Sequence, residues 1–485
     1  MRRILPILHV LGLVVLIFAF TMLLPLGVAF IGRDAALYAY DEAFLITFGS
    51  GLLTWLVTRH NKRELQTRDG FLLVVLVWAV LPAFATLPLL SYLPHLSFTD
   101  AYFETASGLS TTGATVLTGL DALPHSINLW RHLLNWLGGM GIIVLAVAVL
   151  PMLGIGGRQL FKAETHGPMK DSKLTPRIAD TAKSLWLVYA AITLACIVAL
   201  KIAGMNWFDA VCHAFAAMGL GGFSTHDASV GYFNSPAIEA VLIVFMLLAA
   251  MNFATHFLAF RSRSLRAYRV DPEVLPMLGL VLVSCIVGAL YIWQAGTYPS
   301  YWTALRHVSF NLVSLATDCG FASVDFNQWP IFVPLWMLFL SCVTVSSGST
   351  GGGIKMIRSL LIFKQSQREL QRQIHPTAVL PIKLGGVPVS SQVAFAVQVF
   401  VMLYIGSILA LTLILVASGL DFLSAFSAII ACINNAGPGL NQVGPATNYS
   451  VLTDFQTWVC TFAMLLGRLE LMTVFVLFTR TFWRA

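Results

Sequence analysis

Long apolar segments separated by short polar segments run along almost the whole chain. A helix of about 20 apolar residues spans the hydrocarbon core of a bilayer, so these segments predict membrane crossings. We expect ten crossings, at residues 6–31, 43–58, 70–93, 127–153, 184–204, 236–260, 274–294, 330–363, 392–418 and 455–479. The segment 330–363 is too long for one span and contains a glycine cluster, which predicts a broken helix. The pattern indicates an all-α polytopic membrane protein.

Four shorter segments are too brief and too polar to cross, and each ends in a turn that contains glycine. They lie at residues 98–113, 207–222, 302–320 and 421–437, and they align on Gly113, Gly222, Gly320 and Gly437. A half-helix that enters the membrane and an irregular strand that leaves it form a re-entrant pore loop. The order predicts four helix–pore-loop–helix repeats after an N-terminal helix pair. We place the boundaries at 1–69 for the pair and at 70–160, 161–265, 266–385 and 386–485 for the repeats.

Composition and charge support this interpretation. The chain is 58% hydrophobic and 11% charged, whereas soluble domains carry about 25% charged residues. The net charge of +7 comes from Lys and Arg clustered in alternate inter-helix segments, while the other segments, with Glu104 among them, carry mainly acids. By the positive-inside rule the basic segments and both termini are cytoplasmic. This placement argues for a multi-pass protein in a lipid bilayer and against a nucleic-acid partner.

The glycine loops have the chemistry of a cation site. A partly dehydrated cation needs a ring of oxygen ligands, and backbone carbonyls can supply it. Glycine permits the positive φ angles that turn successive carbonyls inward, although any single loop could equally be an ordinary turn. The candidate ligands are Thr111, Thr112, Gly113, Leu220, Gly221, Gly222, Thr317, Asp318, Cys319, Gly320, Asn434, Asn435, Ala436 and Gly437.

A second candidate site lies deeper in the membrane. Arg468 sits inside the apolar run 455–479, where an arginine costs at least about 2.5 kcal/mol. It follows Gly437 by the same interval that separates Gly351 from Gly320, so the two lie at one depth if the repeats align. We predict a gate; the alternatives are a passive kink in the helix and a structural ion pair of Arg468 with Glu470. The candidate gate residues are Gly348, Ser349, Thr350, Gly351, Gly352, Gly353, Lys355 and Arg468.

These segments, with the run Ser346–Lys355, resemble the Trk/Ktr/HKT superfamily of potassium transporters and most of all its bacterial TrkH-type pore subunits. The resemblance implies a pseudo-fourfold pore for potassium uptake across the bacterial cytoplasmic (inner) membrane, gated by the glycine loop. It also implies a homodimer, a cytoplasmic nucleotide-binding regulatory subunit as partner, and K⁺ as the transported ion without an organic cofactor. Relatives that admit sodium often carry serine at the first loop glycine, so Gly113 favours potassium. Ala114 and Pro438 depart from the Gly-Phe pattern of the other two loops.

Two other classes of function remain to be weighed. An ion-coupled secondary transporter of another solute usually has inverted repeats and several buried acids, whereas these loops share one direction and Glu470 is the one clear intramembrane acid. An intramembrane enzyme would need paired carboxylates or a motif such as HExxH or GxSxG within a span. The chain has none of these, so we expect no enzymatic activity.

Overall fold

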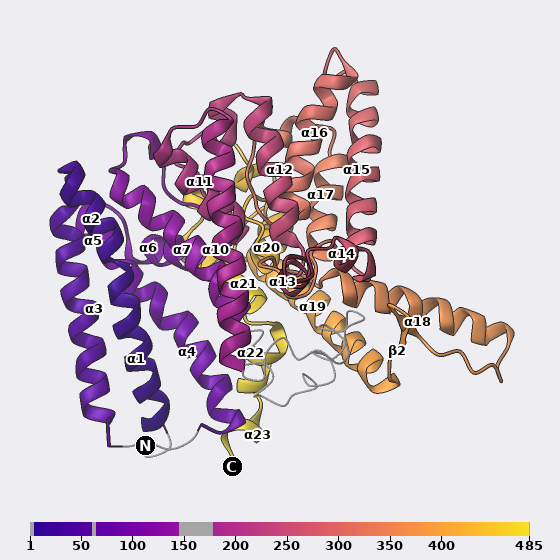
Figure 1. Ribbon diagram of the computed structural model, residues 1–485, viewed down its shortest axis with the longest axis horizontal. Helices are drawn as coiled ribbons and strands as arrows, with labels where there is room; N and C mark the ends of the chain where they lie inside the picture. The colour runs from indigo at the N-terminus through magenta and orange to yellow at the C-terminus, as the bar shows by residue number, and fades with distance from the viewer. Residues whose placement is uncertain (1–3, 61–64, 145–177, 485) are drawn as a thin grey trace.

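The computed structural model describes residues 4–60, 65–144 and 178–484, and the statements below concern these residues. Its helices form one bundle in which most of the long helices run in the same general direction (Figure 1). The N-terminal pair stands at one edge of this bundle. It consists of α1 (Leu5–Thr21), continued by α2 (Leu23–Gly32), and α3 (Leu37–Thr58).

The rest of the chain repeats one order four times, which confirms the predicted architecture. Each repeat has a long first helix, a short helix that ends at a glycine loop, and a return helix. The first helices are α4 (Thr67–Ala85), α10 (Ile178–Ile202), α15 (Val274–Gln294) and α19 (Ser391–Ala417). The short helices are α6 (Phe98–Leu109), α11 (Trp207–Gly219), α16 (Tyr301–Ala316) and α20 (Phe422–Asn434). The return helices are α7 (His125–Val144), α12 (Pro236–Ala250), α17 (Phe332–Val343) and α21 (Asp454–Arg468).

Shorter elements connect these helices. The helical ones are α5 (Leu87–Tyr92), α13 (Phe253–Ser262), α14 (Arg266–Val270), α18 (Met356–Ile374), α22 (Leu471–Leu477) and α23 (Arg480–Trp483). Single turns of 3₁₀-helix are η1 (Leu120–Ala122), η3 (Ser229–Phe233), η4 (Phe326–Gln328), η5 (Asn441–Val443) and η6 (Tyr449–Val451). The strands β1 (Lys383–Leu384) and β2 (Val387–Pro388) pair antiparallel, with Lys383 opposite Pro388.

The four short helices begin in the same way because each has a polar side chain at its N-cap. That side chain accepts a hydrogen bond from a backbone N–H of the first turn, which would otherwise lack a partner inside the helix. The capping residues are Ser97, Asn206, Ser300 and Asp421. Part of the acidic charge between the crossings therefore serves to start the short helices.

Three return helices are interrupted rather than straight. The break in 330–363 was expected, and it separates α17 from α18. The crossings predicted at 236–260 and 455–479 are bent: α12 and α13 meet at 99°, and α21 and α22 at 111°. The first bend follows from Asn252, whose side chain caps α13 by accepting from Ala254 N at 2.8 Å. The second occurs at Glu470, which has a left-handed φ of 56°.

The number of crossings is supported in part. Five of the described helices are long and apolar enough to span a membrane, and the number rises to seven if each bent pair counts as one span. The crossings predicted near α3, α7 and α17 remain predictions. The boundary expected at residues 160 and 161, and most of the basic segment around it, lie outside the described residues.

Candidate functional site: a ring of glycine loops above an internal loop

The four loop glycines form a closed ring. A Cβ atom built on each of them would lie under 3.0 Å from a carbonyl oxygen of the next repeat, a spacing that real Cβ atoms essentially never show. The carbonyl in each case belongs to the residue just before that repeat's own glycine. The pairs are Gly113 with Gly221, Gly222 with Cys319, Gly320 with Ala436, and Gly437 with Thr112. The last pair returns to the first repeat, so the loops surround one axis.

The backbone of the four loops has the same conformation. The residue two before each glycine is left-handed: Thr111 (φ 56°), Leu220 (φ 53°), Asp318 (φ 62°) and Asn435 (φ 58°). Each glycine also has a positive φ, between 59° and 89°. The peptide N–H between these two residues donates at 2.8 Å to the small residue six before the glycine, which is Ser107, Ala216, Ser314 or Ala431. The four loops therefore share one backbone conformation, although their sequences are only weakly similar.

The predicted ligands fall into two groups in the structure. Those from the glycine and the residue before it make up the ring itself. Three of the others have side chains fixed by hydrogen bonds: Thr317 donates to Val313 O at 2.8 Å, Asn434 to Ser341 Oγ at 2.8 Å, and Asn435 to Thr112 Oγ1 at 2.9 Å. A cavity on the opposite side of the ring is lined by Gly113, Gly222, Gly320, Pro438 and residues that follow the loops. The ring thus forms the floor of a vestibule.

The glycine run between α17 and α18 packs directly beneath this ring. Gly352 N donates to the Asp318 carboxylate at 3.0 Å, and the Thr350 hydroxyl donates to Met218 O at 3.1 Å. A Cβ on Gly352 would lie under 3.0 Å from the carbonyl oxygen of Asn434. The predicted gate residues therefore contact the second, third and fourth repeats from below. We call the segment from Gly348 to Lys355 the internal loop.

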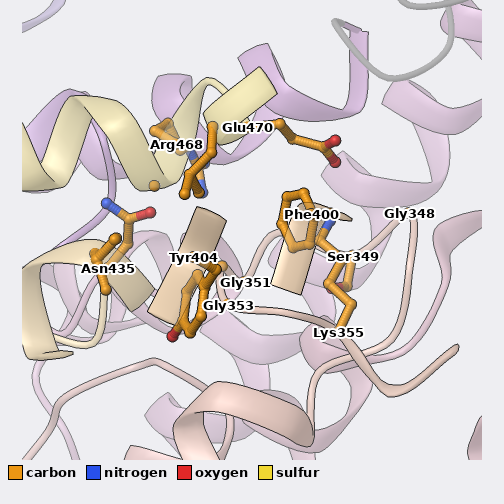
Figure 2. Close-up of a pocket in the computed structure, with 14 residues that line it drawn as sticks. Gly348, Ser349, Gly351, Gly353, Lys355, Phe400, Tyr404, Asn435, Arg468 and Glu470 are labelled. Carbon is orange, nitrogen blue, oxygen red and sulfur yellow. The ribbon is translucent and has the colours of Figure 1, made fainter. Parts of the chain in front are cut away.

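Arg468 reaches the same internal loop from the end of α21. Its guanidinium donates to Thr350 O at 2.7 Å and to Gly138 O of α7 at 2.9 Å, and its side chain is 1% exposed. The alignment of depths expected from the sequence is therefore correct. Figure 2 shows Arg468, Asn435, Tyr404 and the internal loop around one pocket. The arginine ties the loop to the first repeat.

The alternative ion pair of Arg468 with Glu470 is wrong. Glu470 pairs with Arg358 of α18 at 3.0 Å, and the Arg358 guanidinium also lies 4.1 Å from the centre of the Phe400 ring. The chain bends between residues 468 and 470, so the two side chains contact different parts of the fold. The Glu470 pair fastens α18, the helix that leaves the internal loop, to the C-terminal repeat.

Sequence reasoning missed a charged pair behind the ring. Glu104 was assigned to an outer acidic segment, yet it lies inside α6 and contacts Arg131 of α7 at 2.8 Å, with each side chain 1% exposed. Glu239 and Asp318 are also buried, so Glu470 is not the one intramembrane acid. No local sequence pattern pairs Glu104 with a residue of α7. Arg131 is the one Lys, Arg, Asp or Glu residue of the predicted crossing 127–153.

The described residues contain no group of three or more His, Cys, Asp or Glu side chains that could hold a metal ion. The feature suited to a cation is instead the ring of backbone carbonyls. Ligands of this kind suit weakly held monovalent ions that are partly stripped of water. The fold and the ring together define the class of pore-loop cation transporters.

Comparison with known proteins identifies the family within this class. The chain matches the TrkH family, described as cation transport proteins, over residues 38–284 and 277–484, and it belongs to this family. It is 47% identical to the Trk system potassium uptake protein TrkH of Salmonella typhimurium, over 98% of both chains. It is 39% identical to TrkG of Escherichia coli, also over 98% of both. The crystal structure of the potassium transporter TrkH from Vibrio parahaemolyticus superimposes with a TM-score of 0.91, at 44% identity and 99% coverage of each chain.

Proposed function

We propose that this chain forms the pore for potassium uptake across the bacterial cytoplasmic membrane. The observation that carries the proposal is the closed ring in which each loop glycine contacts a carbonyl of the next repeat. The predicted ligands listed for the four loops supply the coordinating oxygens, and K⁺ is the transported ion. The relatives named as potassium uptake proteins support the choice of ion.

The ring needs four glycines because the loops approach one another too closely for a side chain. A left-handed residue followed by a glycine of positive φ alternates the direction of successive peptide groups, which lets carbonyls face the axis. These carbonyls replace the water shell of the ion as it enters. The residue directly after the loop glycine is Ala114 in the first repeat and Pro438 in the fourth, whereas it is phenylalanine in the other two. The four loops are therefore chemically unequal.

The internal loop acts as the gate in this proposal. It lies directly below the ring and is fixed there by Asp318 and Arg468. A buried guanidinium also repels cations that leave the ring, because its charge is poorly screened in a low-dielectric region. Opening requires the loop to leave these two contacts, and α18 moves with it because it begins at the next residue.

The partners expected from the resemblance remain part of the proposal. α18 extends away from the bundle (Figure 1) and carries Lys364, Arg368 and Arg372. A basic helix attached directly to the internal loop is well placed for a cytoplasmic nucleotide-binding regulatory subunit. We also propose a homodimer, with both termini cytoplasmic. α1 begins and α23 ends at the same end of the molecule (Figure 1), which supports this topology.

The experiment that tests the proposal is uptake of radiolabelled rubidium into liposomes that contain the purified protein. Potassium, sodium and lithium compete in parallel samples, and empty liposomes provide the background. We expect potassium to block uptake far better than sodium or lithium does. Absence of cation uptake above background would reject the pore and favour the coupled transport of another solute.

A further inference from the structure

One position in each short helix fastens the loop of its own repeat. It lies nine residues before the loop glycine in the first three repeats, and its neighbour takes the role in the fourth. Its side chain bonds to the strand that leaves the loop two or three residues after the glycine. The contacts are Glu104 with Val116 N at 3.0 Å, His213 with Ser224 Oγ at 3.0 Å, Asn311 with Ser323 N at 3.1 Å, and Ser427 with Leu440 N at 2.8 Å.

The first repeat differs from the others because its fastening residue is a charged carboxylate. Glu104 accepts from Arg131 Nε at 2.8 Å and from the hydroxyl of Thr115 at 2.9 Å. Burying an ion pair costs desolvation energy, and apolar residues of similar size often stabilise a fold equally well. The pair therefore calls for an explanation other than stability alone.

Arg131 supplies that explanation, because it also reaches the next repeat. Its Nη1 donates to the carbonyl oxygen of Ser224 at 3.1 Å, and its guanidinium lies 4.3 Å from the centre of the Phe223 ring. The adjacent His132 places Nε2 3.0 Å from the carbonyl oxygen of Phe223. Phe223 and Ser224 follow Gly222 directly, so one arginine holds the exits of two neighbouring loops in register.

We infer that Arg131, oriented by Glu104, is a positioning residue that sets the ion preference of the ring. It fixes the second loop relative to the first, and so determines how far apart their carbonyls stand. The inference rests on the proposed function. It goes beyond it by assigning selectivity to Arg131, which lines the cavity above the ring together with Gly113 and Gly222.

Arg131→Lys is the variant that isolates this role. Lysine keeps the cation opposite Glu104, but it has a single ammonium group and cannot hold the carboxylate and the Ser224 carbonyl in the fixed fork of a guanidinium. Arg306→Lys is the control, because Arg306 also pairs with a buried glutamate, donating to Glu239 at 2.7 Å and 2.9 Å. That pair joins α16 to α12 without contacting a loop exit.

Rubidium uptake is measured for wild type and both variants, with potassium and sodium as competitors. For Arg131→Lys we expect sodium to compete about tenfold better relative to potassium, the scale of one lost charge-assisted hydrogen bond. Arg306→Lys keeps the wild-type ratio. An unchanged ratio in Arg131→Lys, or an equal shift in both variants, would overturn the inference.

A second variant covers the case in which Arg131→Lys does not fold. Phe223→Leu removes the ring under the guanidinium and leaves the ion pair and the Ser224 carbonyl in place. A smaller shift of the ratio toward sodium supports the inference, and a wild-type ratio contradicts it. Wild-type protein without any preference for potassium would instead reject the proposed function, and the inference with it.

Discussion

At the scale of single residues, Gly113 is the most sensitive position of the ring. Its φ is 79°, and a Cβ there would lie under 3.0 Å from the Gly221 carbonyl. Gly113→Ser must therefore displace the second loop as well as strain its own backbone, at about 1–3 kcal/mol for the backbone alone. We expect the preference for potassium over sodium in rubidium uptake to fall by about tenfold or more.

Gly119 provides the control for this substitution. Its φ of 70° is equally left-handed, but no atom lies within 4 Å of the position of its Cβ. Gly119→Ser thus carries the backbone strain without the collision. If it reduces the preference as much as Gly113→Ser does, the approach of neighbouring loops is not the cause.

Arg468 is the second residue with a direct prediction. Arg468→Ala removes two hydrogen bonds from a charged donor, to Thr350 O and Gly138 O, each worth about 1.5–3 kcal/mol. It also removes the buried cation below the ring. We expect rubidium uptake to rise by about tenfold or more.

The control for Arg468→Ala is Arg480→Ala, which removes an exposed arginine from the same end of the chain. It should leave the rate of uptake unchanged. A rate for Arg468→Ala at or below that of wild type would contradict its part in the gate.

Sequence reasoning located the ring but not the residues that shape it. The glycines were recognisable because few other residues reach positive φ. The left-handed residues two positions earlier were not, since threonine and leucine rarely adopt that conformation and only the shared fold of the four loops requires it. Glu104 and Arg131 were missed because their contact joins two helices, and no local pattern encodes it.

At the scale of elements, one hydrogen bond from Gly352 N to the Asp318 side chain joins the internal loop directly to a loop of the ring. Asp318→Ala removes the acceptor, whereas Asp318→Asn keeps an oxygen in the same place. We expect Asp318→Ala to raise rubidium uptake by about two- to tenfold, because a hydrogen bond is worth about 0.5–1.5 kcal/mol. Asp318→Asn should raise it much less. Equal rates for the two variants would show that the bond does not hold the loop closed.

The breaks in the helices show which element features a sequence reveals. The glycine run in 330–363 predicted its break because glycine weakens a helix by about 1 kcal/mol per residue. The bends after α12 and α21 carry no such run. They arise where Asn252 caps α13 and where Glu470 adopts a positive φ and pairs with Arg358. An apolar stretch looks continuous across both positions.

At the scale of the whole molecule, the fourfold repeat made the fold predictable. The four repeats share one backbone arrangement, but their side chains are not the same. The four short helices share capped starts, loop conformation and a fastening position. Their side chains nevertheless differ, from the carboxylate of Glu104 to the hydroxyl of Ser427. The repeat thus fixes the geometry around the axis, and the residues at equivalent positions differ. We propose that these differences set ion preference and gating.

The topology of the whole chain gives the last prediction. The loops that leave the ring should face outward, and α18 should face the cytoplasm. Six of the seven cysteines are buried and Cys342 is only partly exposed, so a cysteine introduced at an exposed position stands out in labelling. Ala446→Cys should react with a membrane-impermeant maleimide added to intact cells. Gln373→Cys should react only after the cells are opened.

Both positions are exposed in the structure, so a difference between them reports the side of the membrane and not burial. The reverse pattern would place the basic segments outside and turn the direction of uptake around. It would then require the outer vestibule above the ring to receive ions from the cytoplasm. Labelling of both positions in intact cells would indicate leaky cells, which a cytoplasmic marker protein measured in the same samples would reveal.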